Sequence, residues 1–106
     1  MPKWNNPTTD NLLRATLALK NLKEARQFFR DLLTEPELLE FGRRWQAAQM
    51  LNDRVPYSKI VAKTGLSSTT VARISKWLKR GMGGYKLMLA RLANHHTNPS
   101  FEKRLS

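Results

Sequence analysis

The sequence of 106 residues contains no cysteine and no long hydrophobic run. The absence of cysteine excludes disulfides, cysteine nucleophiles and cysteine-ligated zinc, and it is compatible with the cytosol. No segment approaches the roughly 20 consecutive apolar residues of a membrane-spanning helix. The first residues, Met1 to Asn6, are polar and do not resemble a signal peptide. We therefore expect a cytoplasmic protein with no membrane partner.

Acidic residues are nearly missing from the second part of the chain. Residues 1–40 carry six Lys/Arg and six Asp/Glu, whereas residues 41–106 carry thirteen Lys/Arg and only Asp53 and Glu102. The whole formal net charge of +11 therefore lies in the second part. Such segregated charge favours a polyanion such as double-stranded DNA, although a solvated basic surface would have the same composition.

Strand patterns are also absent, because residues 10–92 show neither alternation nor clustered β-branched residues. We expect an all-α fold of about six helices. A single helical domain is predicted over residues 10–94, between a flexible N-terminal arm over residues 1–9 and a flexible C-terminal tail over residues 95–106. Thr9 or Asp10 is the expected cap of the first helix.

Two helix patterns in the first half constrain packing. The predicted helix over residues 22–33 places Phe28 and Phe29 on one broad apolar face, which needs a deep groove or a partner chain to cover it. Thr34 and Glu37 form a capping-box pattern at the start of a third helix that ends near Asp53. The side chains expected to be buried on this third helix are Leu38, Leu39, Phe41, Trp45, Ala48 and Leu51.

Residues 57–79 form the most specific pattern, two short helices joined by a tight turn at Thr64-Gly65-Leu66. Gly65 tolerates the positive φ that the turn requires, and Ser67 can cap the second helix. The apolar residues that fall at packing positions are Ile60, Val61, Leu66, Val71 and Ile74. This is the pattern of a DNA-binding helix-turn-helix, and an ordinary helical hairpin would share only part of it.

The second helix of this pattern opens with short hydroxyl side chains that can contact base edges or bound water in the major groove. Lysines on the first helix can reach the DNA backbone, and cations further along the second can contact phosphate or guanine. The predicted DNA-binding residues are Lys59, Lys63, Ser67, Ser68, Thr69, Thr70, Arg73 and Lys76.

The chain resembles the Trp repressor superfamily, in particular its repressor-like proteins of the YerC/YecD type. The resemblance extends over about residues 12–92 and includes LKNLKEARQFFRDLL, RRWQAAQML, KTGLSSTTVARISKWL and RGMGGY, of which residues 64–78 are the specific part. It implies an all-helical, intertwined homodimer whose N-terminal helices interlock across subunits. It also implies a sequence-specific transcriptional regulator, of repressor type, whose second helix binds the operator.

The resemblance also bears on the effector. Arg43 and Arg73 match two arginines that help to hold the tryptophan corepressor of the Trp repressor, but Ile74 matches a small glycine that leaves room for the indole, and Trp77 matches a nearby serine. The equivalent pocket is therefore expected to be filled. Tryptophan is not the expected corepressor, the effector stays unknown, and no cofactor is implied.

Other features favour neither an enzyme nor a metal protein. No catalytic arrangement can be argued from the residues. His95 and His96 point about 100° apart on a helix, so they are a poor chelating pair, and we expect no metal site. Two alternatives remain open: a DNA-end-binding component of a transposition system, and an interaction adaptor that binds an acidic protein. The adaptor surface would comprise Lys76, Lys79, Arg80 and Lys86.

Overall fold

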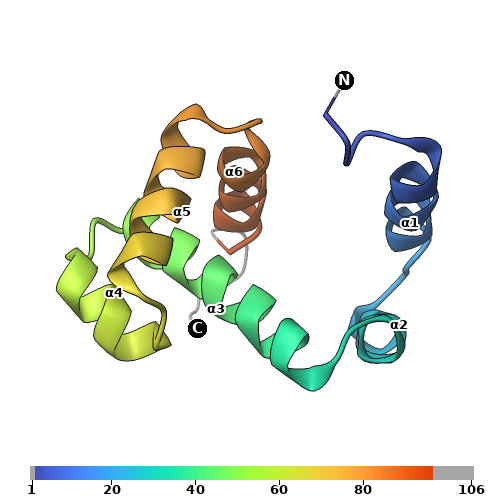
Figure 1. Ribbon diagram of the computed structural model, residues 1–106, viewed down its shortest axis with the longest axis horizontal. Coiled ribbons are helices and arrows are strands. Elements are labelled where there is room, and N and C mark those ends of the chain that lie inside the picture. Colours follow the sequence, from blue (N-terminus) through green and yellow to red (C-terminus); the bar gives the residue numbers. More distant parts are fainter. Residues whose placement is uncertain (1, 97–106) are drawn as a thin grey trace. The chain divides into compact units, whose positions relative to one another are not determined.

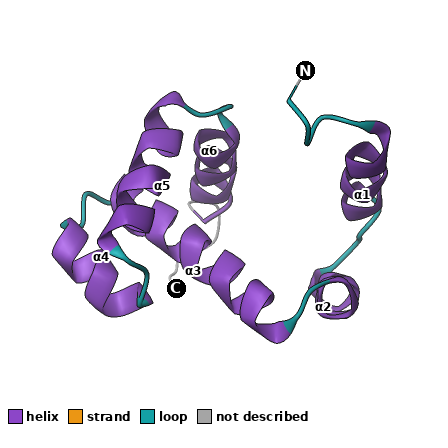
Figure 2. Cartoon of the chain, viewed as in Figure 1, coloured by secondary structure: helices purple, strands orange, loops and turns teal. Residues whose placement is uncertain are grey.

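The computed structural model describes the backbone of residues 2–96 and the side chains of residues 2–93. This part of the chain contains six helices and no strand (Figures 1 and 2), which confirms the all-α fold class. The helices are α1 (Pro7–Leu17), α2 (Leu22–Leu32), α3 (Glu35–Asn52), α4 (Tyr57–Thr64), α5 (Ser68–Arg80) and α6 (Gly84–His96). The chain divides into two compact units, Met1–Leu39 and Glu40–Ser106.

Helix α1 begins earlier than the sequence predicted. Its N-cap is Asn6, whose side-chain oxygen accepts a hydrogen bond of 2.8 Å from the Thr9 amide, so the prediction of Thr9 or Asp10 as the cap was wrong. Pro7 follows the cap, at a position where the missing amide hydrogen has no intrahelical partner to lose. The start of α1 therefore includes the last three residues of the predicted arm.

At the other end, α6 continues to His96, two residues beyond the predicted end at Asn94. The side chains of His95 and His96, and residues 97–106 of the predicted tail, lie outside the described residues.

The first unit leaves its apolar side chains uncovered within the chain. Neither α1 nor α2 contains a buried residue, and Leu17 has 85% of its surface exposed. Phe28 and Phe29 are half-buried and pack edge to face with their ring centroids 5.3 Å apart. The two phenylalanines therefore cover one another in part, and most of the leucines beside them face outward.

The predicted capping box at the start of α3 is confirmed. The Thr34 hydroxyl accepts a hydrogen bond of 3.3 Å from the Glu37 amide, and the Glu37 carboxylate accepts one of 2.9 Å from the Thr34 amide. Hydrogen bonds from the Thr34 backbone and side chain hold the pKa of Glu37 below its ordinary value. These reciprocal bonds satisfy two amides that the helix itself leaves without a partner.

The prediction of buried residues along α3 was correct only in part. Ala48 is fully buried, and Trp45 and Leu51 pack against the core, but Leu39 is half exposed and Phe41 has 50% of its surface exposed. The reason is that the core of the second unit contacts α3 only from Trp45 onward.

The second unit is organised around that core. The core consists of Ala47, Ala48, Ile60, Leu66, Val71 and Ile74. Figure 1 shows α4 and α5 beside the C-terminal part of α3, and the core residues come from these three helices and the turn between α4 and α5. On α6, Tyr85 stacks on Trp45 with ring centroids 6.3 Å apart, and its burial there raises the pKa of the phenol while the charge of Arg44 opposes the shift.

The backbone of the turn between α4 and α5 predicts that alanine substitutions at two glycines have opposite effects on stability. Gly65 has φ of +76°, and a methyl group added there would meet no atom within 4 Å, so Gly65→Ala would add only backbone strain. We expect it to lower the free energy of unfolding by about 1–2 kcal/mol. Gly42 lies inside α3 with the same free space, so Gly42→Ala should raise stability by about 0.5–1 kcal/mol. Urea unfolding of both variants measures the difference, and a change of the same sign in both would contradict the role of the turn.

Candidate nucleic-acid interface

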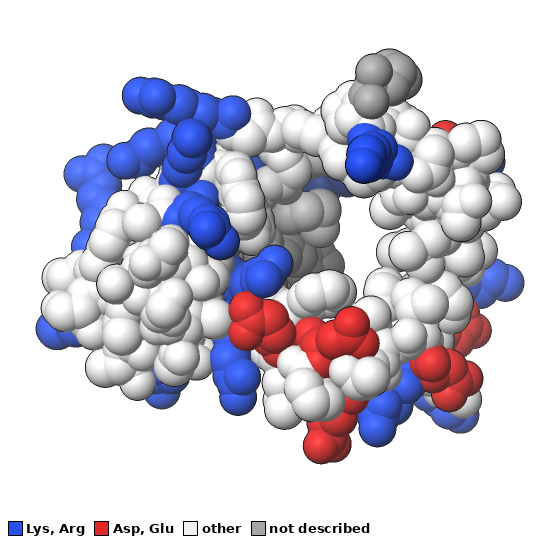
Figure 3. Space-filling view, in the orientation of Figure 1, with Lys and Arg blue, Asp and Glu red and all other residues white. Residues whose placement is uncertain are grey.

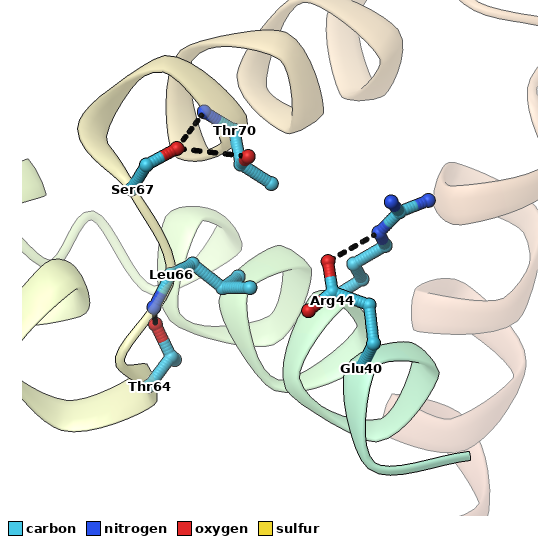
Figure 4. A network of polar contacts seen from close by, with 6 residues as sticks. All are labelled: Glu40, Arg44, Thr64, Leu66, Ser67 and Thr70. Atoms are coloured by element: carbon cyan, nitrogen blue, oxygen red, sulfur yellow. Dashed lines mark hydrogen bonds and ion pairs between the residues drawn. The ribbon is translucent and has the colours of Figure 1, made fainter. Parts of the chain in front are cut away.

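Helices α4 and α5 are joined by a turn that several hydrogen bonds hold rigid. Gly65 adopts the left-handed conformation and donates its amide hydrogen to the Val61 carbonyl at 2.9 Å. The buried Thr64 hydroxyl donates to the Ile60 carbonyl at 2.7 Å. It also accepts a hydrogen bond of 3.2 Å from the Leu66 amide (Figure 4). Leu66 then enters the core beside α3, which anchors the turn. The predicted role of Gly65 is thereby confirmed.

Ser67 caps α5, as the sequence predicted. Its hydroxyl oxygen accepts a hydrogen bond of 3.1 Å from the Thr70 amide and donates one of 2.9 Å to the Thr70 hydroxyl (Figure 4). Thr70 is half-buried, and its hydroxyl oxygen is already an acceptor in this pair. The Thr70 hydroxyl is therefore partly engaged in the cap, and its hydrogen and one lone pair remain for an approaching ligand.

The two sides of α5 differ completely in character. Val71, Ile74 and Ser75 are buried against the rest of the unit. The opposite side carries four residues spaced four, three and four positions apart, which places them along one face of a helix. This face, named here the α5 stripe, consists of Thr69, Arg73, Lys76 and Arg80, all exposed.

The predicted DNA-binding residues are distributed over both helices of the motif. Lys59 and Lys63 are exposed on α4, and Ser68 is exposed at the start of α5. The α5 stripe brings Thr69, Arg73 and Lys76 together. It also includes Arg80, which the sequence analysis had assigned only to the adaptor alternative. The helical spacing from Arg73 to Arg80 would have identified Arg80 as a residue of the same face.

The electrostatics of this surface are one-sided. Residues 54–93 contain no Asp or Glu. Within the described residues the ion pair present is that of Arg44 with Glu40 on α3, at 3.1 Å (Figure 4). In the view of Figure 3, Lys and Arg gather over α5, and among the described residues from 54 onward no carboxylate accompanies them. A surface of this kind attracts an extended polyanion more than a single counter-ion.

The residues matched to the corepressor pocket of the Trp repressor differ in their burial. Arg43 is exposed, and Ile74 has no exposed surface because it is part of the core. Trp77 is 45% exposed, and it lines a broad apolar hollow of about 560 Å³ together with Trp45 and Met88.

Two further observations concern the described part of the chain. None of the helices within residues 2–96 is long and apolar enough to cross a membrane. Among residues 2–93, whose side chains the structure describes, no group of three or more His, Asp or Glu is placed to hold a metal ion.

The cap of α5 leads to a prediction about the leading turn. Ser67→Ala removes both bonds to Thr70 and should lower the free energy of unfolding by about 1 kcal/mol. Ser68→Ala, at the exposed neighbouring position, is the matched control and should change stability by less than about 0.5 kcal/mol. Thermal unfolding of both variants provides the test, and equal stabilities would show that the cap does not hold the start of α5.

Comparison with known proteins agrees with this geometry. Residues 8–93 match the Trp repressor protein family. Protein YerC of Bacillus subtilis (strain 168) is 35% identical over 98 residues, which cover 92% of this chain and 94% of that protein. The crystal structure of a TrpR-like protein from Eubacterium eligens ATCC 27750 superimposes with a TM-score of 0.82 at 35% identity, over 88% of this chain and 96% of that one. A crystal structure of a Staphylococcus aureus protein gives a TM-score of 0.80 at 33% identity, over 86% of this chain and 91% of that one. The chain thus belongs to the Trp repressor family.

Proposed function

We propose that this protein is a sequence-specific DNA-binding transcriptional regulator, of repressor type, whose helix α5 reads the major groove. The observation that carries the proposal is the α5 stripe, in which a short hydroxyl residue at the leading turn is followed by three cations on a firmly held helix. None of the three forms an ion pair within the part of the chain that the structure describes. Membership of the Trp repressor family supports it.

The residues have different proposed roles. Ser68, Thr69 and Thr70 lie at the leading turn, where short side chains can contact base edges or bridging water. Arg73 lies one turn further along and can bind guanine or phosphate. Ser67 acts through the cap that holds the leading turn. Lys59, Lys63 and Lys76 are assigned to backbone phosphates, which position the protein without reading sequence.

We propose that the active form is a homodimer. Helices α1 and α2 contain exposed leucines and no buried residue, and Phe41 at the start of the second unit is half exposed. Apolar surface of this extent is typical of an interface between subunits. A two-fold axis would then place two copies of α5 about 34–36 Å apart, the distance of one turn of DNA.

We further propose that tryptophan is not the effector. Ile74 is fully buried at the position where the relative that binds tryptophan has glycine, so its branched side chain occupies the space an indole would need. The core then holds α5 in place without a ligand.

The DNA-binding proposal is tested with duplexes selected from a random pool at physiological salt. Arg73→Ala should weaken binding to the selected duplex by about 1–3 kcal/mol and relax preference at one base pair. Lys76→Gln should weaken binding to all duplexes alike and lower the slope of log K against log salt by about 1 unit. Lys23→Gln on α2 removes the same charge outside the proposed surface and should change neither quantity. Binding of an acidic protein with no preference among duplexes would instead favour an adaptor.

The dimer proposal is tested by light scattering and circular dichroism. Phe29→Asp places a charge in the apolar face of α2, and it should unfold the protein rather than yield a folded monomer, because obligate dimers often lack a stable monomer. Gln27→Asp introduces the same group at an exposed position of α2 and should leave the dimer intact. A parent protein that is a folded, monodisperse monomer at micromolar concentration would contradict the proposal.

The effector proposal is tested by calorimetry. Millimolar tryptophan should give no heat of binding and should leave DNA affinity unchanged, because the equivalent space is occupied by Ile74. Saturable tryptophan binding that also tightened the complex with DNA would show that the side chain does not block the site.

A further inference from the structure

A second hollow lies on the side of α5 that faces away from the α5 stripe. It has a volume of about 540 Å³ and is bounded by the end of α3, the connection to α4 and the C-terminal half of α5. Leu51, Val55 and Leu78 are apolar side chains in its wall, and Arg54, Ser75 and Lys79 are polar ones. A volume between about 300 and 1,000 Å³ with a few converging polar groups is characteristic of small-molecule sites.

The Ser75 hydroxyl is the first sign of a missing partner. Ser75 is only 5% exposed, yet its hydroxyl forms no hydrogen bond with any other residue in the described part of the chain. Thr64 shows the usual alternative, since its hydroxyl donates to the carbonyl four residues earlier at 2.7 Å. A buried hydroxyl without a partner is unfavourable, and it lies here in the wall of a hollow that a ligand can enter.

Arg54 is the second unusual residue. It follows α3 with φ of +62°, its amide donates to the Leu51 carbonyl at 3.0 Å, and the Val55 amide donates to the Met50 carbonyl at 3.0 Å. These two bonds are those of a Schellman motif, in which the left-handed position is usually glycine. An arginine is therefore present where the backbone favours a residue without a side chain, and that side chain lines the hollow.

The hollow is also positively charged. Arg54 and Lys79 both line it, and no carboxylate does. The neighbouring acid, Asp53, lines a separate smaller hollow on the side of Trp45 and Leu89. Two cations and an unpartnered hydroxyl beside an apolar wall match a molecule with an anionic group at one end and an apolar body at the other.

We propose that this hollow binds a small amphipathic anion, a carboxylate or phosphate ester with an apolar body. Its charged group lies between Arg54 and Lys79 and accepts a hydrogen bond from Ser75, while its body packs on Leu51, Val55 and Leu78. The bound molecule links the end of α3 to α5 and stabilises that arrangement.

The backbone of DNA is a poorer occupant of the same charges. Ser75 follows Arg73 by two residues, so on an α-helix the two side chains point about 160° apart. A duplex on the α5 stripe therefore lies away from Ser75. A phosphodiester of the DNA backbone also has no apolar body to pack against the apolar wall of the hollow. The proposal is independent of the DNA-binding function, and either can fail alone.

The test uses the full chain and phenyl phosphate as the probe, with benzyl alcohol as its neutral analogue and inorganic phosphate as its anion alone. Titration is followed by amide chemical shifts and thermal unfolding. Phenyl phosphate should shift amides in residues 51–57 and 75–79 saturably and raise the unfolding temperature. Both analogues should bind at least about tenfold more weakly, because benzyl alcohol lacks the anionic group and inorganic phosphate lacks the apolar body. No saturable shift by phenyl phosphate at millimolar concentration, or equal binding of inorganic phosphate, would overturn the proposal.

Variants separate a ligand site from a structural role. Arg54→Gly should weaken phenyl phosphate binding by about tenfold, the loss of one charged hydrogen bond, and should raise the unfolding temperature of the free protein by removing left-handed strain. Ser75→Ala and Lys79→Gln should also weaken binding. Arg80→Gln, next to Lys79 but on the α5 stripe, is the matched control and should bind the probe like the parent. If Arg80→Gln weakened phenyl phosphate binding equally, the effect would come from the general positive charge of the surface, and the proposed site would be refuted.

A last arm separates the ligand from DNA. The protein bound to its selected duplex should still bind phenyl phosphate with unchanged affinity, since the two surfaces point apart. Stoichiometric displacement of the probe by duplex would identify the hollow as a contact for backbone phosphate and overturn the small-molecule proposal.

Discussion

The contact of two buried alanines on α3 with the helix-turn-helix determines the rest of the second unit. Ala47 and Ala48 have no exposed surface, and the side chains packed on them come from α4, the turn and α5. With so few core residues, each contact is a large share of the stability, and a larger residue at either alanine would move α5 away from α3. The burial of Ile74 in this small core also decides which side of α5 faces outward as the α5 stripe.

Charge and packing are separated within the same helix. The inner face of α5 provides the apolar contacts, so the outer face is free to carry cations, which pair with no carboxylate among the described residues. Unpaired positive charge on a surface is unfavourable through mutual repulsion and becomes favourable only when a polyanion releases its own counter-ions. A surface that is adapted to binding, rather than to the stability of the isolated chain, has this composition.

The first unit presents the complementary case. Its helices have well-formed caps, with Asn6 for α1, Asn21 for α2 and the Thr34–Glu37 box for α3. Its apolar side chains nevertheless remain uncovered within the chain. Local hydrogen bonds define where these helices begin, but helices of this length are stabilised mainly by tertiary packing. A second subunit is the source of packing that we propose.

The sequence by itself determined those features that depend on neighbouring residues. Helix type, the capping box, the turn at Gly65 and the cap at Ser67 follow from local conformational preferences. The family resemblance, most specific at residues 64–78, is confirmed by a match over residues 8–93. Only the tertiary structure decided which apolar residues are buried. Leu39, Phe41 and Trp77 have the spacing of core residues and are exposed, because periodicity selects a helix face without specifying what covers it. The hollow beside Ser75 was equally invisible in the sequence, since Arg54 and Lys79 come together only when the end of α3 meets α5.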